Sequence, residues 1–190
     1  MRKKKNNSLF GKTKRLGFMP GLCIEENTMA ELTFRFAKRS DVPLIFEFIN
    51  ELAEYEKLTD CLVTTEHDLD KWIFQKEKAE VLFVLEDGAE VGFVLFFSSF
   101  PAYIHGAGIY IEALYIKPAY RGKGYGKATF QKLAVIAYER GCGRIEWCCL
   151  DWNPTMEFYR AIGAEIMDDL TVCRFNRKGI ELLAGKNDTN

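Results

Sequence analysis

The sequence lacks several features that would assign it to a familiar class of protein. Its six cysteines include no Cys-x-x-Cys pair and it has only two histidines, so it offers neither zinc-ligand spacing nor a disulfide framework. Residues 1–28 lack the apolar core of a signal peptide, and no later apolar run is long enough to span a membrane. We therefore expect a cytoplasmic protein with free thiols, no resident metal and no membrane partner.

Charge is unevenly distributed along the chain. The net charge is −1, but residues 1–28 carry seven Lys or Arg against two Glu, which leaves 19 positive and 25 negative residues in the rest. An acidic body favours cationic partners and argues against a nucleic-acid-binding domain. We interpret residues 1–28 as a basic, disordered leader, 29–185 as one domain and 186–190 as a short tail; a nucleic-acid-binding arm is the alternative for the leader.

Hydrophobic periodicity predicts a single α/β domain. The expected strands cover residues 32–36, 81–85, 91–97, 108–116, 144–150 and 171–175. Helices are expected after Ser40, after Thr65 (burying Leu69, Trp72 and Ile73), after residue 126 and after Asn153, with a last helical turn at 180–184. This order is not the regular alternation of a doubly wound sheet, so it predicts a mixed sheet instead.

A glycine-dense turn separates an expected strand from an expected helix. Its sequence is Arg121-Gly122-Lys123-Gly124-Tyr125-Gly126. Glycine lets the backbone approach a ligand closely and adopt positive φ. The helix that follows offers unpaired N–H groups and the positive end of its dipole to an anion. The segment therefore predicts a phosphate-binding turn.

Several interpretations of this turn differ in the phosphate that it binds. A Walker A loop would need a hydroxyl after Lys127, where the chain has Ala128. A dinucleotide fingerprint would need an acidic residue about 20 positions on, after a second parallel strand, and none fits. An ordinary turn explains one or two glycines but not three at alternate positions behind an arginine. The pattern Arg/Gln-x-x-Gly-x-Gly/Ala is matched by Arg121, Gly124 and Gly126.

With this motif the chain resembles the GNAT superfamily of acetyl-CoA-dependent N-acetyltransferases over residues 32–184. Further segments resemble its diamine, polyamine and thialysine acetyltransferase branch: Glu-Leu-Ala-Glu-Tyr-Glu at 51–56, Tyr-Ile-Glu at 110–112, Leu-Asp-Trp-Asn at 150–153 and Phe-Tyr at 158–159. The resemblance implies a single GNAT-type domain with a mixed, mostly antiparallel central sheet flanked by helices. It also implies acetyl-CoA as the acetyl donor and a homodimer.

The resemblance assigns donor-binding roles to three segments. The CoA diphosphate would be held by Arg121, Gly122, Lys123, Gly124, Tyr125, Gly126 and Lys127. Main-chain groups of Leu114, Tyr115 and Ile116 would contact the pantetheine and the thioester carbonyl, which requires a locally splayed strand; simple core packing is the alternative. Asn153 would contact the cofactor arm, and its alternative role is to cap the helix that Pro154 opens.

The same resemblance implies a general acid. Tyr159 would protonate the departing thiolate, with ordinary aromatic packing as the alternative. The branch spaces this tyrosine seven residues after the asparagine, whereas Asn153 and Tyr159 are six apart. One residue rotates a helical side chain by about 100°, so the loop before the helix must absorb the difference.

Acidic residues are the candidates for the acceptor side. Glu112 interrupts an apolar strand, where an unpaired carboxylate is costly, so we expect it to bind the amine and take its proton; a solvated strand face is the alternative. Tyr55 and Glu56 would line the acceptor site. The branch has a second acid after the first, where this chain has Ala113, which leaves a shorter amine or an amino acid as open as a polyamine.

Acetylation of a small cationic amine in a ternary complex is the function that the sequence favours. Acetylation of a protein or peptide amine is one alternative. A non-catalytic CoA-binding module is another, although the presence of both Tyr159 and Glu112 counts against it.

Overall fold

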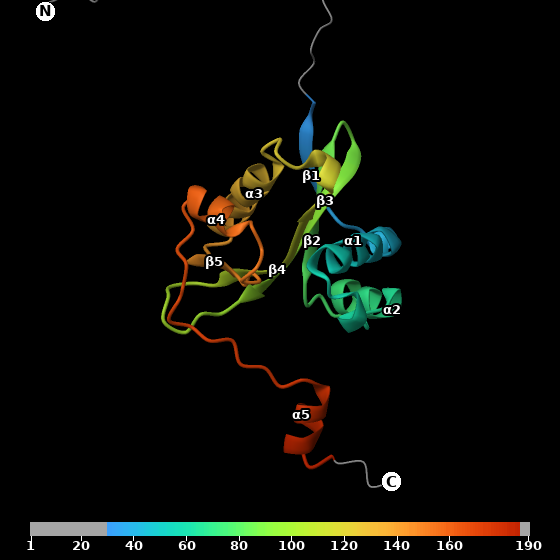
Figure 1. Cartoon of the computed structure of the whole chain (residues 1–190), viewed down its shortest axis with the longest axis vertical. Helices are drawn as coiled ribbons and strands as arrows, with labels where there is room; N and C mark the ends of the chain where they lie inside the picture. Colours follow the sequence, from blue (N-terminus) through green and yellow to red (C-terminus); the bar gives the residue numbers. More distant parts are fainter. Residues whose placement is uncertain (1–29, 187–190) are drawn as a thin grey trace, which may run out of the picture. The chain divides into compact units, whose positions relative to one another are not determined.

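The computed structural model describes residues 30–186, which contain one five-stranded sheet with helices against it (Figure 1). The strands are β1 (Leu32–Phe36), β2 (Glu80–Glu86), β3 (Ala89–Ser99), β4 (Gly108–Ile116) and β5 (Arg144–Trp147). They lie in sequence order, and β4 with β5 is the single parallel pair of this sheet. The predicted mixed, mostly antiparallel sheet is confirmed. The leader predicted at 1–28 and residues 187–190 of the tail lie outside the described residues.

Helices flank the sheet on both faces (Figure 1). They are α1 (Val42–Glu56), α2 (Glu66–Leu69, continued by a π-helical segment, Asp70–Gln75), α3 (Tyr125–Glu139) and α4 (Met156–Ala161). A further helix, α5 (Arg177–Leu183), contributes no residue to the hydrophobic clusters of the sheet within the described range. Short 3-10 helices lie at Arg39–Asp41, Thr59–Cys61 and Pro118–Tyr120. The α1 and α2 helices cover one face, while α3 lies against the other with α4 beside it.

Burial on both faces explains the continuous apolar run of β2. Val81 and Phe83 pack with Phe48 of α1, whereas Leu82 between them packs with Leu133 of α3. Successive strand residues point to opposite faces, so a strand covered on both sides needs apolar residues at every position. The sheet thereby carries two hydrophobic layers, one on each face.

Three details of the predicted elements are wrong. The strand predicted at 144–150 ends at Trp147. Residues 171–175 form no strand, and Phe175 at their end is 68% exposed. Alternating residues favour a strand locally, but a strand also needs a neighbour to pair with, and this segment has none among residues 30–186. Trp72 is 49% exposed rather than buried, because the helix changes to a π-helical turn at Asp70 and its side chains change phase.

A capping box starts α2 at Thr65, the residue after which this helix was predicted. The hydroxyl of Thr65 accepts a hydrogen bond from the backbone N–H of Asp68 at 3.2 Å, and a carboxylate oxygen of Asp68 accepts from the backbone N–H of Thr65 at 3.1 Å. This reciprocal pair is a capping box, which satisfies two N–H groups that the first turn leaves unpaired.

Replacing Phe93 by alanine should destabilise the fold strongly. Phe93 is fully buried and its ring lies 5.3 Å from that of Phe48, so the cavity left behind should lower the free energy of unfolding by about 3–5 kcal/mol. The matched control is Phe100→Ala, at a side chain that is 83% exposed, where a change within about 0.5 kcal/mol is expected. Urea denaturation of both variants measures the difference, and equal losses would contradict this account of the core.

Candidate functional site

A cavity of about 580 Å³ opens where β4 and β5 separate. Their parallel pairing ends at Ile111 and Trp147, yet β4 continues to Ile116. Residues 114–116 of β4 and 148–150 after β5 both line the cavity. The strand is therefore splayed at the place where the sequence interpretation required it.

The glycine turn, which precedes α3, lies at the edge of this cavity. Gly122 and Gly124 have positive φ of 77° and 86°, and Gly124 is the N-cap of the helix. Both conformations favour glycine. Gly126 has a different reason to be small: an added Cβ would lie 3.3 Å from the Phe158 ring. Two glycines thus shape the turn, and the third lets α3 pack against α4.

A contact with β2 anchors the turn. The Lys123 ammonium lies 2.8 Å from a carboxylate oxygen of Glu86, and the Tyr125 hydroxyl donates to the same oxygen. Hydrogen bonds from Lys123 and Tyr125 lower the pKa of Glu86, and the carboxylate raises the pKa of Tyr125 to about 12. Of the seven residues predicted to hold the diphosphate, Lys123 alone does not line the cavity.

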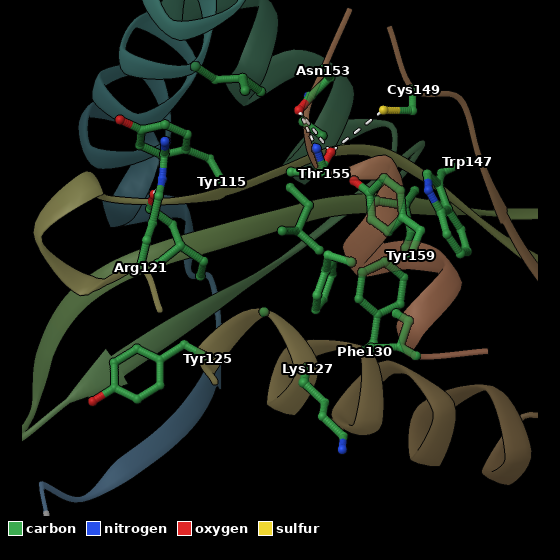
Figure 2. Close-up of a pocket in the computed structure, with 18 of the residues that line it drawn as sticks. Tyr115, Arg121, Tyr125, Lys127, Phe130, Trp147, Cys149, Asn153, Thr155 and Tyr159 are labelled. Carbon is green, nitrogen blue, oxygen red and sulfur yellow. Dashed lines mark hydrogen bonds between the residues drawn. The ribbon is translucent and has the colours of Figure 1, made fainter. Parts of the chain in front are cut away.

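Arg121 reaches across the end of β4. Its Nε donates to the carbonyl oxygen of Ile116 at 2.8 Å. Its guanidinium lies 4.3 Å from the ring centroid of Tyr55 and 5.3 Å from that of Tyr115, within the range of cation–π attraction. Figure 2 shows Arg121 and Tyr115 on one side of the cavity, apart from Tyr159. Arg121 therefore connects the glycine turn with α1.

Tyr159 lies in an aromatic wall of the cavity. Its ring centroid is 5.1 Å from that of Trp147, 5.9 Å from Phe130 and 5.5 Å from Phe158. Burial raises the pKa of its phenol above the ordinary value, and hydrogen bonding with Thr155 acts in the opposite direction. The shift is away from neutral pH, where an ordinary tyrosine is already protonated. Packing and proton donation, the two interpretations of this residue, are compatible.

Asn153 closes the turn that precedes α4. Its side-chain oxygen accepts from the backbone N–H of Thr155 at 3.1 Å, from the Thr155 hydroxyl at 2.9 Å and from the Tyr55 hydroxyl at 3.5 Å (Figure 2). The sequence interpretation offered capping of the following helix as the alternative to cofactor contact, but the N-cap of α4 is Thr155, and Asn153 instead holds the turn before the helix. The side-chain oxygen is used within the protein, and the NH₂ group is the part of the amide that could donate to a ligand.

Glu112 lies in a β-bulge of β4. Leu95 is opposite Ala113 and the next residue, Phe96, is opposite Ile111, so Glu112 is the extra residue. Its side chain is exposed. The prediction that its carboxylate is buried in the strand at an energetic cost is therefore wrong. It nevertheless lines the cavity, together with Tyr55 and Glu56. Burial raises the pKa of the Glu56 carboxyl.

Thr155 is the site residue that the sequence interpretation missed. Its hydroxyl bonds to Asn153, lies 3.7 Å from the sulfur of Cys149 and lines the cavity with them. A signal was available, because Thr155 precedes Tyr159 by four residues and the two share one face of a helix.

Residues 30–186 contain no group of three or more His, Cys, Asp or Glu side chains arranged to hold a metal ion. The cysteines of this part of the chain are all free. No helix within the same range combines the length and the apolar character needed to cross a membrane.

Comparison with known proteins agrees with this geometry. Residues 46–164 match the model of the acetyltransferase (GNAT) family. A thialysine N-epsilon-acetyltransferase from Bos taurus is 36% identical over 83% of this chain and 100% of that protein. An L-ornithine N5-acetyltransferase from Arabidopsis thaliana is 27% identical over 86% and 96%. A solved integron cassette protein from V. cholerae is 27% identical over 80% and 97%, with a TM-score of 0.67. The chain belongs to the GNAT family and is an acetyl-CoA-dependent N-acetyltransferase.

Proposed function

We propose that the enzyme transfers the acetyl group of acetyl-CoA to a primary amine of a small cationic metabolite: a diamine, a polyamine or a lysine-like amine. Transfer occurs by direct attack within a ternary complex. The observation that carries this proposal is a single cavity lined both by the glycine turn and by Glu56, Glu112 and Tyr159. The names of the bovine and Arabidopsis relatives, which specify thialysine and L-ornithine, support an amine of this kind.

The donor is held by main-chain groups along one side of the cavity. N–H groups of residues 122–127 and the N-terminus of α3 bind the diphosphate, with added charge from Arg121 and Lys127. Lys123 supports the turn through its ion pair with Glu86. Residues 114–116 bind the pantetheine as an added strand would. The ending of the β4–β5 pairs at Ile111 supports this role, and the NH₂ group of Asn153 adds a donor.

The reaction needs one base and one acid. Glu112 takes a proton from the ammonium of the acceptor, and the neutral nitrogen attacks the thioester carbonyl. Main-chain N–H groups of β4 stabilise the oxyanion that forms. The carbon–sulfur bond then breaks, Tyr159 gives its proton to the departing thiolate, and the attacking nitrogen releases its remaining extra proton to water. Glu112 then loses its proton to solvent and the Tyr159 phenolate regains one from it. A phenol is protonated at neutral pH, so Tyr159 has a proton to give, and it lines the same cavity as Glu112.

The acceptor site selects a cation. Glu56 and Glu112 supply two carboxylates, and Tyr55 supplies an aromatic face for contact with an ammonium group. Since Ala113 provides no second acid beside Glu112, a short amine or an amino acid fits as well as a polyamine. Tyr55 also donates to Asn153, so the acceptor site and the α4 turn are in contact.

We also propose a cytoplasmic homodimer with no nucleic-acid or membrane partner. Large apolar side chains are exposed near the C-terminal end of the described chain: Ile166, Met167, Leu170, Val172, Phe175, Ile180, Leu182 and Leu183. A concentration of exposed apolar residues is typical of an interface, which supports self-association. Free thiols suit a reducing compartment.

A thiol-release assay with acetyl-CoA tests the proposed function. The panel should contain diamines, polyamines, lysine and ornithine analogues and peptides. We expect CoA release with at least one small amine and a much lower kcat/KM with peptides. Turnover confined to peptides would replace the small-molecule acceptor by a protein amine, and no turnover with any member would favour a non-catalytic CoA-binding module.

Alanine at Gly124 should weaken CoA binding at least tenfold. The residue has a φ of 86°, where a Cβ costs about 1–2 kcal/mol, and the methyl group would stand where the diphosphate meets the backbone. Gly88→Ala is a matched control, because Gly88 has a φ of 83° in the β2–β3 hairpin and, like Gly124, open space around an added Cβ. Calorimetry should find normal CoA affinity in the control; equal affinity of both variants would remove the glycine turn from donor binding.

Glutamine at Glu112 should lower kcat about a hundredfold, as expected for loss of a general base. Glu56→Gln is the comparison, since it removes the other carboxylate of the cavity; it should raise the KM for the amine and leave kcat nearly unchanged. If Glu56→Gln causes the loss of kcat while Glu112→Gln retains it, Glu56 is the base.

A further inference from the structure

The Thr155 hydroxyl is the centre of a small polar cluster in an otherwise aromatic wall. It donates to the Asn153 side-chain oxygen at 2.9 Å and lies 3.7 Å from the Cys149 sulfur, and Figure 2 shows the Tyr159 hydroxyl directed toward it. Phe130, Trp147 and Phe158 enclose the ring of Tyr159. In these apolar surroundings each polar contact has a large effect on the phenol, because burial makes hydrogen bonds electrostatically stronger.

Helix geometry fixes Thr155 and Tyr159 relative to each other. The backbone N–H of Tyr159 donates to the carbonyl oxygen of Thr155 at 3.0 Å. Side chains four residues apart lie on the same face of a helix. Thr155 is therefore carried into the site by the same helical turn as Tyr159.

Asn153 fixes the other side of the cluster. Its side-chain oxygen accepts both the N–H and the hydroxyl of Thr155, so a threonine side chain that turned away would lose its hydrogen bond to Asn153. This turn also shows how a spacing of six residues is accommodated: Asn153 remains outside the helix, which begins at Met156.

The Thr155 hydroxyl has one proton to donate, and the acceptor of that proton can change during the reaction. A threonine hydroxyl has a single proton and can rotate. That proton is given to Asn153 while the Tyr159 phenol is intact. Once the phenol has released its proton, the negative oxygen is the stronger acceptor, and rotation redirects the threonine proton to it.

We propose that Thr155 is a positioning residue for acid catalysis: its hydroxyl, oriented by Asn153, holds the Tyr159 phenol and stabilises the transient phenolate left when the CoA thiolate takes the proton. The phenolate is later reprotonated by water. This inference rests on the proposed acid role of Tyr159. The direction in which Thr155 moves the pKa of Tyr159, downward and against the effect of burial, is the direction expected for a group that stabilises the phenolate.

Two substitutions at this position separate the hydroxyl from the shape of the side chain. Thr155→Val keeps the shape and loses the hydroxyl, whereas Thr155→Ser keeps the hydroxyl. We expect valine to lower kcat about ten- to a hundredfold, as for loss of a hydrogen bond to a charged group, with the KM for acetyl-CoA and for the amine unchanged. Serine should restore kcat to within about threefold. Equal losses in both variants, or full activity with valine, would overturn the proposal.

A double-mutant cycle with Tyr159→Phe tests whether Thr155 acts through Tyr159. Valine should have no further effect on kcat in the phenylalanine background, because the group that it supports is gone. An equal fold loss in both backgrounds would show that Thr155 acts independently, and would contradict the proposal.

A spectroscopic readout separates this inference from the proposed function. In protein labelled with 3-fluorotyrosine, Tyr159→Phe identifies the fluorine resonance of Tyr159. Thr155→Val should move the titration of this resonance to higher pH, and Thr155→Ser should leave it in place. No shift with valine would overturn the inference even if the wild-type enzyme acetylates amines. A shift in an enzyme that turns over no amine would sustain the Thr155–Tyr159 contact and reject the proposed function.

Discussion

The end of parallel pairing between β4 and β5, at Ile111 and Trp147, is the constraint on which the rest of the site depends. Beyond that pair the main chain of β4 borders a cavity, so its N–H and C=O groups can serve a ligand in place of a neighbouring strand. The glycine turn follows β4 after one short 3-10 helix, and α4 follows β5. Residues of both segments line the opening. A continuous sheet would fill this space with strand-to-strand hydrogen bonds.

Contacts on either side of the opening hold the two halves of the site in place. The turn is tied to β2 through Glu86 and to α1 through the stacking of Arg121 on Tyr55. Tyr55 in turn donates to Asn153 at the start of α4. A continuous set of contacts therefore joins the proposed donor site, the acceptor wall and the general acid. We infer that the two substrates are bound in one preorganised space, which suits direct transfer.

Local patterns predicted the fold well and the site in part. The capping box at Thr65 and the positive φ of Gly124 follow from neighbouring residues, and the sequence shows both. The pairing of Lys123 with Glu86 and the bulge at Glu112 depend on which strands lie together, which local sequence does not encode. The same reason explains the unpaired segment 171–175, whose alternating pattern was interpreted as a strand. Thr155 was overlooked although its spacing to Tyr159 placed it on the same helical face.

The central claim is that donor, amine, base and acid meet in the cavity between β4 and β5. A crystal structure with a bisubstrate analogue, in which CoA is joined to a lysine-like amine, tests it most directly. The account predicts the diphosphate on the N–H groups of residues 122–127, the pantetheine along residues 114–116, the amine nitrogen beside Glu112 and the sulfur within hydrogen-bond reach of the Tyr159 hydroxyl. An analogue bound outside this cavity, or a Tyr159 hydroxyl directed away from the sulfur, would contradict it.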